Sequence, residues 1–262
     1  MILTGSFDPI SEKDLEALRT FQKEHHLKDL YVSVTEEGIL SKEERTQLLK
    51  LAFRPYRHMH VTNEAGEPFE TQDEERIRHG EFHLAANGIR TALIGNNFYL
   101  DEIVDHMCKP HRADHSRRVA EVCVHLAHVH HLDEKKAYRM GMLHDITKKM
   151  SDEEGRKILE RYDPDKLDIS PKVWHSFTAV YWLKENMGLY DPVVLNAIYH
   201  HTLGDGKSPY DNILYIADKI EPGRGYDTGR QMKEAETDLK KAASIILEES
   251  KAYILEKEGI HV

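Results

Sequence analysis

Residues 140–145, Met-Gly-Met-Leu-His-Asp, are the most informative stretch of the helical half of the chain, because an apolar helical segment ends there at His144 and Asp145. Two adjacent side chains at one helix end point in different directions, so they cannot both face the same core. One of the two is therefore directed toward a cleft between helices. Imidazole and carboxylate groups bind metals and carry protons near neutral pH, so this pair is a candidate for chemistry.

More histidines and one aspartate stand on or at the edge of separate predicted helices: His115, His175, His200, His201 and Asp218. Single ligands from several helices build metal sites in the cores of helical bundles. Imidazoles and carboxylates without thiolates suit iron, manganese, cobalt or zinc, and one carboxylate can bridge two ions. Any one of these histidines alone is better explained as a surface or hydrogen-bonded core residue. Asp218 lies in an apolar stretch where an unpaired carboxylate is costly, although Lys219 or Arg224 could pair with it.

The first hundred residues instead alternate short β-type runs with helical ones. The expected strands are Met1–Thr4, Leu30–Val34, His58–Thr62 and Thr91–Ile94. The expected helices are Asp14–His25, Lys42–Phe53 and Gln72–Ala86. Such alternation predicts a small open parallel sheet with crossover helices. From about Asp105 the pattern is helical only, with helices expected at Arg112–His131, Asn212–Ile220 and Gln231–Glu256. The fold class is thus an α/β N-terminal domain, residues 1–107, followed by an all-α domain, residues 108–262.

Composition limits the function further. The 262 residues carry 36 basic and 46 acidic side chains, a formal charge of −10, which argues against a general nucleic-acid binder. No apolar run approaches the length of a membrane span, and no signal peptide is recognised. With two cysteines, a disulfide framework is disfavoured. We therefore expect a cytoplasmic protein that binds no nucleic acid and no membrane. The oligomeric state stays open, with a homodimer as one option.

Read together, five stretches resemble the HD-domain phosphohydrolases: His115-Ser116, residues 143–148 (Leu-His-Asp-Ile-Thr-Lys), His175, residues 201–204 (His-Thr-Leu-Gly) and residues 215–224 (Tyr-Ile-Ala-Asp-Lys-Ile-Glu-Pro-Gly-Arg). The last two stretches are similar to the YqeK-type symmetrical diadenosine tetraphosphate hydrolases of bacteria. The resemblance covers roughly Pro110 to the C-terminus. It implies a metal-dependent hydrolase that cleaves dinucleoside tetraphosphates into two nucleoside diphosphates.

The resemblance also implies a set of site residues. By position, the matching metal ligands are His115, His144, Asp145, His175, His201 and Asp218. The metal is expected to be a divalent transition ion, iron first, in a centre that could hold two ions, with manganese or cobalt able to replace it. His200 has no role in the match, and Thr178 stands where a glycine is expected.

Polyphosphate hydrolysis explains why such residues would gather. A bound metal polarises a phosphoryl oxygen and lowers the pKa of its water. Lys148, three residues after Asp145, is placed to meet a phosphate, and the planar fork of Arg224 suits phosphate oxygens. We therefore expect Asp145, Lys148 and Arg224 to act in catalysis on a small-molecule nucleotide.

Residues 4–10, Thr-Gly-Ser-Phe-Asp-Pro-Ile, resemble the start of bacterial nicotinate-nucleotide adenylyltransferases. In that family two histidines follow and stabilise the transferred phosphates. Here Ser11 and Asp14 stand at those positions, and Lys13 stands where a glycine belongs. Because Asp14 would repel phosphates, this domain is interpreted as degenerate and kept for packing, regulation or weak nucleotide binding.

Three alternatives remain open from the sequence. The first is an HD phosphohydrolase of another nucleotide, such as a nucleotidase or a (p)ppGpp hydrolase. The second is an active adenylyltransferase. The third is a non-catalytic nucleotide sensor that keeps the metal but does not turn over.

Overall fold

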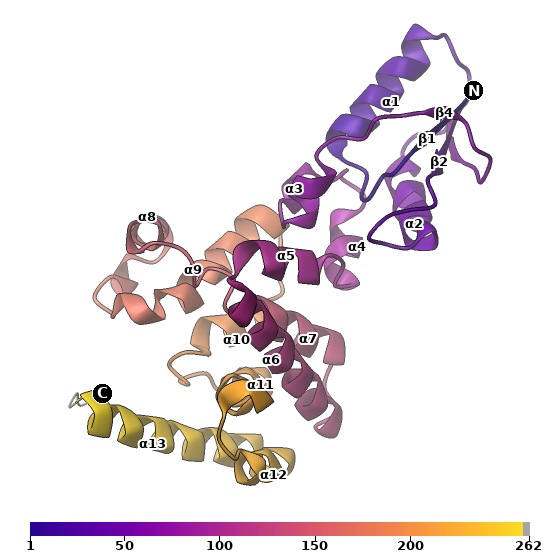
Figure 1. Cartoon of the computed structure of the whole chain (residues 1–262). Coiled ribbons are helices and arrows are strands. Elements are labelled where there is room, and N and C mark those ends of the chain that lie inside the picture. Colours follow the sequence, from indigo (N-terminus) through magenta and orange to yellow (C-terminus); the bar gives the residue numbers. More distant parts are fainter. Residues whose placement is uncertain (259–262) are drawn as a thin grey trace. The chain divides into compact units, whose positions relative to one another are not determined.

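The computed structural model describes residues 1–258, with side chains described as far as Tyr253, and it contains two compact units. The first unit comprises Met1–Ile103 together with Glu185–Leu189. The second comprises Val104–Lys184 and the chain from Tyr190 onward. Figure 1 shows strands only in the first unit, whereas the second is built from helices. The expected fold class, a small α/β region followed by a helical one, is confirmed.

A parallel sheet organises the first unit. Its strands lie in the order β3-β2-β1-β4, with bounds β1 (Ile2–Gly5), β2 (Leu30–Val34), β3 (Met59–Val61) and β4 (Glu67–Pro68). Leu3 pairs with Val32 on one side and with Glu67 on the other. Both apolar members of this row are buried, at 3% and 0% exposed. The sheet therefore buries the β-branched and aliphatic runs from which it was predicted.

The fourth strand is not where the sequence analysis places it, and that prediction is wrong. Thr91–Ile94 lies inside helix α4 (Arg90–Gly95), and Glu67–Pro68 supplies the edge strand instead. Ile89 and Leu93 are both fully buried. Their spacing of four residues places them on one face of a helix, whereas a strand would alternate. Pro68 has no N–H to donate, and it is tolerated because β4 pairs on one side only.

Four more helices complete the first unit and lead out of it: α1 (Glu12–Glu24), α2 (Lys42–Phe53), α3 (Glu74–Arg78) and α5 (Leu100–Met107). Helix α2 begins with the predicted capping box, in which Ser41 and Glu44 each bond the other's backbone N–H. The helix expected over Gln72–Ala86 is much shorter. It stops before Gly80, whose φ of +103° is incompatible with a helix.

The second unit contains eight α-helices among its described residues. They are α6 (Pro110–Val129), α7 (Glu134–Leu143), α8 (Asp152–Tyr162), α9 (Trp174–Trp182), α10 (Pro192–His200), α11 (Pro209–Ile220), α12 (Gly229–Thr237) and α13 (Leu239–Glu258). The single helix expected at Gln231–Glu256 is two helices, because Asp238 adopts extended backbone angles between them. In the part of the chain that is described, no helix combines the length and the apolar character that crossing a membrane requires.

Candidate metal centre

Five helices of the second unit bring the predicted ligands together. His115 lies on α6, His175 on α9 and Asp218 on α11. His144 and His201 are the C-caps of α7 and α10. Every predicted ligand is buried, with between 0% and 8% of its surface exposed. The structure thus gathers residues that are up to about a hundred positions apart in the sequence.

Helix α7 can approach α6 closely because residue 141 is glycine. A Cβ at Gly141 would lie 2.5 Å from the Cα of Ala120 and 2.8 Å from its backbone nitrogen. Real Cβ atoms do not come this close to a backbone, so any side chain would force the helices apart. The close crossing places the end of α7, and with it His144, beside His115, and the two ring centroids lie 5.3 Å apart.

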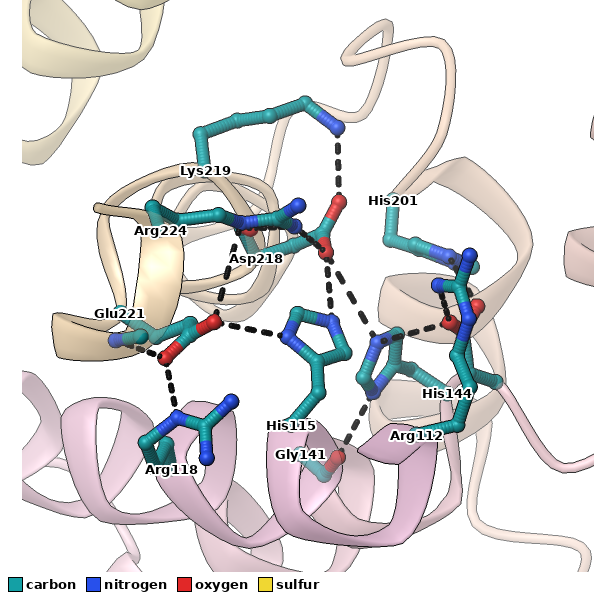
Figure 2. Close-up of polar contacts among 12 residues, drawn as sticks. Arg112, His115, Arg118, Gly141, His144, His201, Asp218, Lys219, Glu221 and Arg224 are labelled. Carbon is teal, nitrogen blue, oxygen red and sulfur yellow. Dashed lines mark hydrogen bonds and ion pairs between the residues drawn. The ribbon is translucent and has the colours of Figure 1, made fainter. Parts of the chain in front are cut away.

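One group of potential ligands consists of His115, His144 and Asp218 (Figure 2). Asp218 Oδ1 lies 3.1 Å from His115 Nε2 and 3.8 Å from His144 Nε2. One ligand atom from each residue lies within 4.8 Å of the others. A single cation could therefore be bound by two imidazoles and one carboxylate.

The second group consists of His144, Asp145 and His201, and His175 adjoins it. The two oxygens of Asp145 face different partners. Oδ1 lies 3.1 Å from His175 Nε2 and 3.7 Å from His201 Nε2, whereas Oδ2 lies 3.8 Å from His144 Nε2. The carboxylate is thus placed between two sets of nitrogen ligands.

Backbone carbonyls fix the protonation of two imidazoles. His144 Nδ1 lies 2.7 Å from the carbonyl oxygen of Gly141, and His201 Nδ1 lies 2.6 Å from that of Ile198. Because a carbonyl only accepts, each Nδ1 donates its proton and each Nε2 is the nitrogen that carries the lone pair. At His201 this nitrogen lies 3.2 Å from the Thr202 hydroxyl. His144 Nε2 is buried without a hydrogen-bond partner among the described residues. A buried, unsatisfied nitrogen is costly unless it binds something, so the residues present fit a metal ion.

The charge states also fit metal ligands. Burial lowers the pKa of both His144 and His175 to about 4, so these imidazoles are neutral at pH 7. Burial acts to raise the pKa of Asp145, but contacts with the neighbouring histidines outweigh it and hold that pKa well below its usual value. Burial also acts to raise the pKa of Asp218, but the charge of Lys219 and contacts with the histidines outweigh it and hold that pKa well below its usual value. Neutral imidazoles and ionised carboxylates are the forms that bind metals.

Cationic side chains neutralise the two aspartates from outside. Arg112 donates to Asp145 Oδ2 at 2.9 Å. Lys219 contacts Asp218 Oδ2 at 2.7 Å, and Arg224 donates to Asp218 Oδ1 at 2.7 Å and also to its backbone oxygen (Figure 2). Lys148 instead places its Nζ 2.9 Å and 3.0 Å from the two ring nitrogens of His175.

Two site residues were missed by the sequence analysis. Glu221 is 2% exposed, and its Oε1 lies 3.1 Å from His115 Nδ1, so it orients that ring. Its other oxygen accepts from Arg118 at 2.5 Å. Arg112 is the second missed residue. Glu221 follows Asp218 by one helical turn, a spacing that could have indicated it, but nothing in the sequence marks Arg112.

The structure also shows the surroundings of His200 and Thr178, the two residues that the resemblance left without a role. His200 lies outside the cluster and pairs with Asp205 at 2.7 Å. Thr178, found where a glycine was expected, is buried, and its hydroxyl lies 2.9 Å from that of Thr147. The side chain at position 178 therefore ties α9 to the turn that follows Asp145.

In the first unit, Ser11 and Asp14, which stand where two histidines were expected, form the capping box that begins helix α1. The Ser11 hydroxyl accepts from Asp14 N at 3.0 Å, and the Asp14 carboxylate accepts from Ser11 N at 2.9 Å and from Gln72 N at 2.8 Å. Burial raises the pKa of Asp14 to about 6. Nearby, Glu74 accepts from Asp8 N at 2.8 Å and from the Ser6 hydroxyl at 2.7 Å. The chain's own carboxylates thus bond these N–H groups at the end of β1 and the start of α1.

Comparison with known proteins places the second unit. Residues 112–223 match the HD domain. The chain is 32% identical over 153 residues to the symmetrical bis(5'-nucleosyl)-tetraphosphatase of Bacillus subtilis, which covers 56% of this chain and 81% of that protein. It is 35% identical over 160 residues to a probable nicotinate-nucleotide adenylyltransferase/Ap4A hydrolase of Mycoplasma pneumoniae, covering 58% of this chain. That match spans only 46% of the mycoplasma protein, about half its length.

A solved structure agrees with this placement. A predicted HD superfamily hydrolase involved in NAD metabolism from Clostridium acetobutylicum superposes with a TM-score of 0.56 at 31% sequence identity. The superposition covers 62% of this chain and 88% of the other. The helical fold of this chain is therefore shared with a solved protein that is described as a predicted HD superfamily hydrolase.

Proposed function

Since this chain belongs to the HD-domain family of the symmetrical bis(5'-nucleosyl)-tetraphosphatases, we propose that it is a metal-dependent hydrolase that cleaves diadenosine tetraphosphate symmetrically into two ADP. The observation that carries the proposal is the buried Nε2 of His144. It lacks a hydrogen-bond partner among the described residues and faces carboxylate oxygens of Asp145 and Asp218, each 3.8 Å away. We assign the activity to residues 108–262 and regard residues 1–107 as a degenerate adenylyltransferase-like domain.

The metal would be held by the six predicted ligands: His115, His144, Asp145, His175, His201 and Asp218. The donor set contains imidazoles and carboxylates without thiolate, which suits iron, manganese, cobalt or zinc. Of these we assign iron, with manganese or cobalt able to replace it. An imidazole nitrogen has one lone pair and binds one ion, so the two ligand groups that share His144 cannot both use it. If the centre holds two ions, Asp145 would be able to serve both, because its two oxygens face different histidines.

When bound, the metal supplies Lewis acidity toward a phosphoryl oxygen and a water of lowered pKa. The chain's own residues supply the remainder. Lys148 lies at the His175 edge of the cluster, where its ammonium can neutralise a phosphate oxygen. Arg224 donates to the Asp218 carboxylate through Nη2 and to the Asp218 backbone oxygen through Nε, and its remaining N–H groups can face a phosphate. Both cations reduce the cost of placing a polyanion next to two aspartates.

Removal of the metal tests this proposal directly. Purified protein is treated with excess chelator, its metal content is measured, and its products from diadenosine tetraphosphate are separated by anion exchange. We expect activity to vanish on chelation and to return with iron, manganese or cobalt, with ADP as the single product. A nucleotide panel that includes monophosphates and (p)ppGpp distinguishes the other hydrolases. Full activity in metal-free protein would overturn the mechanism, and tight binding without any product would favour a nucleotide sensor.

Two further features support finer proposals. The nucleotide substrate and the two free, buried cysteines, Cys108 and Cys123, are consistent with action in the cytoplasm. The net charge of −10 is consistent with a small-molecule substrate in place of a nucleic acid.

A further inference from the structure

A cationic pocket adjoins the metal centre on the side of Asp145. Its volume is about 240 Å³, and it is lined by Cys108, Lys109, His111, Arg112, Lys148 and Lys149. The lining comes from two segments, the start of α6 and the turn that follows α7. It contains three lysines and one arginine and no carboxylate. Such a concentration of one charge sign is unusual in a chain whose net charge is −10, and it favours an anionic ligand.

The pocket cations differ in what they already bind. Arg112 is paired with Asp145, and Lys148 contacts His175. Lys109 and Lys149 are exposed, and no carboxylate of the described residues lies within ion-pair distance of either one. Their charges are therefore available to a ligand. An exposed lysine usually finds a solvated position, but two of them beside one cavity and next to a catalytic centre are better explained by binding.

The backbone adds to this potential. Lys109 is the N-cap of the 20-residue helix α6, and its side chain makes no capping hydrogen bond. The first N–H groups of α6 are thus left without a side-chain cap, and helix N-termini of this kind attract phosphate. The thiol of Cys108 does not oppose an anion, because burial raises its pKa to about 11 and keeps it neutral at pH 7.

We propose that this pocket binds the part of the phosphate chain that lies beyond the bond being cleaved, and that it selects substrates with long phosphate chains. The inference rests on the proposed function, since it assumes that the scissile phosphate lies at the metal centre. A nucleoside monophosphate has no further phosphate to place there. A dinucleoside tetraphosphate cut in the middle has two, and Lys109 and Lys149 would contact them as point charges.

The test removes the two unpaired lysines together. The variant is Lys109→Gln with Lys149→Gln, and the matched control is Lys233→Gln with Lys240→Gln, two exposed lysines of α12 and α13 that do not line the pocket. Full-length protein as purified is titrated with inorganic tripolyphosphate by calorimetry, and metal content is measured in each preparation. Two exposed charge contacts correspond to about a tenfold weaker Kd in the pocket variant. The control variant should bind like the unmodified protein.

Kinetics with diadenosine tetraphosphate provide a second readout. KM should rise by a similar factor, roughly tenfold, while kcat and metal content stay unchanged. Equal tripolyphosphate affinity in the pocket variant and the unmodified protein would overturn the subsite, whatever the catalytic result. If tripolyphosphate binding weakens as expected but diadenosine tetraphosphate is not hydrolysed by the unmodified protein, the subsite stands and the proposed function fails.

Discussion

Gly141→Ala is expected to damage the metal centre although residue 141 is not a ligand. In most helix interiors this substitution stabilises by about 1 kcal/mol, because alanine has the higher helix propensity. Here the added Cβ would lie 2.5 Å from Ala120 Cα and 2.8 Å from its nitrogen. These are backbone atoms, which cannot rotate away. Overpacking costs typically 1–3 kcal/mol, and contacts this short with backbone atoms fall in the upper part of that range, about 2–3 kcal/mol. After the gain in helix propensity we expect a net loss of roughly 1–2 kcal/mol.

The same shift should reach the metal through His144, the C-cap of α7. Relief of the clash moves α7, and His144 with it, away from His115 on α6. We expect this displacement of one ligand to lower metal affinity by about as much as the loss of an orienting partner does, 10- to 100-fold. Urea unfolding of the metal-free protein measures the first effect, and competition with a chelator of known affinity measures the second.

Gly155→Ala is the matched control. Gly155 lies in helix α8, and a Cβ there would meet only Trp174 at 3.5 Å and Thr178 at 3.9 Å, which are ordinary contacts. This variant should be more stable by about 0.4–1 kcal/mol and should keep its metal. If Gly141→Ala were as stable as Gly155→Ala and retained the metal with unchanged affinity, the close crossing would not position His144.

Three further predictions concern the ligands, pH and the first unit. The metal content of the purified variants should be lowest for Asp145→Ala, intermediate for His144→Ala and unchanged for Lys148→Ala. If Asp145→Ala kept wild-type metal content and turnover, His144 and Asp145 would have only a structural role. The imidazoles of His144 and His175 have a pKa of about 4 when folded and 6.5 in their ordinary state, so the metal-free protein should lose stability as the pH falls from 6.5 to 4. The loss is about 2 kcal/mol per imidazole at pH 4.5, and equal urea midpoints at pH 7 and pH 4.5 would contradict it. Arg45 is fully buried and donates to several backbone carbonyls, so Arg45→Met should destabilise the first unit by about 3 kcal/mol, which thermal unfolding would measure.

The structure brings the candidate ligands together, and the sequence could indicate this because they lie on predicted helices or at their ends. His115, His144 and Asp218 occupy predicted helices or their ends, and those helices were recognisable from caps and apolar periodicity. The orienting groups were not predictable in the same way. The carbonyls of Gly141 and Ile198 are backbone atoms that every residue has, so only the fold shows that two imidazoles bond to them.

Errors arose where local composition and tertiary packing disagree. Thr91–Ile94 contains β-favouring residues, yet it is helical because Ile89 and Leu93 are buried on one face. Glu67–Pro68 is too short and too polar to be recognised as a strand, and only its pairing with β1 makes it one. In both cases long-range contacts override a weak local preference.

The carboxylates at the start of the first unit have a consequence for protein engineering. Asp14 and Glu74 satisfy the N–H groups of Ser11, Gln72 and Asp8 from within the chain. They act as internal anions beside positions 11 and 14, where the adenylyltransferases that residues 4–10 resemble carry two histidines. Restoring two histidines at positions 11 and 14 would therefore not recover transferase activity. Glu74 would still occupy the Asp8 N–H, so a revertant would need a neutral residue at position 74 as well.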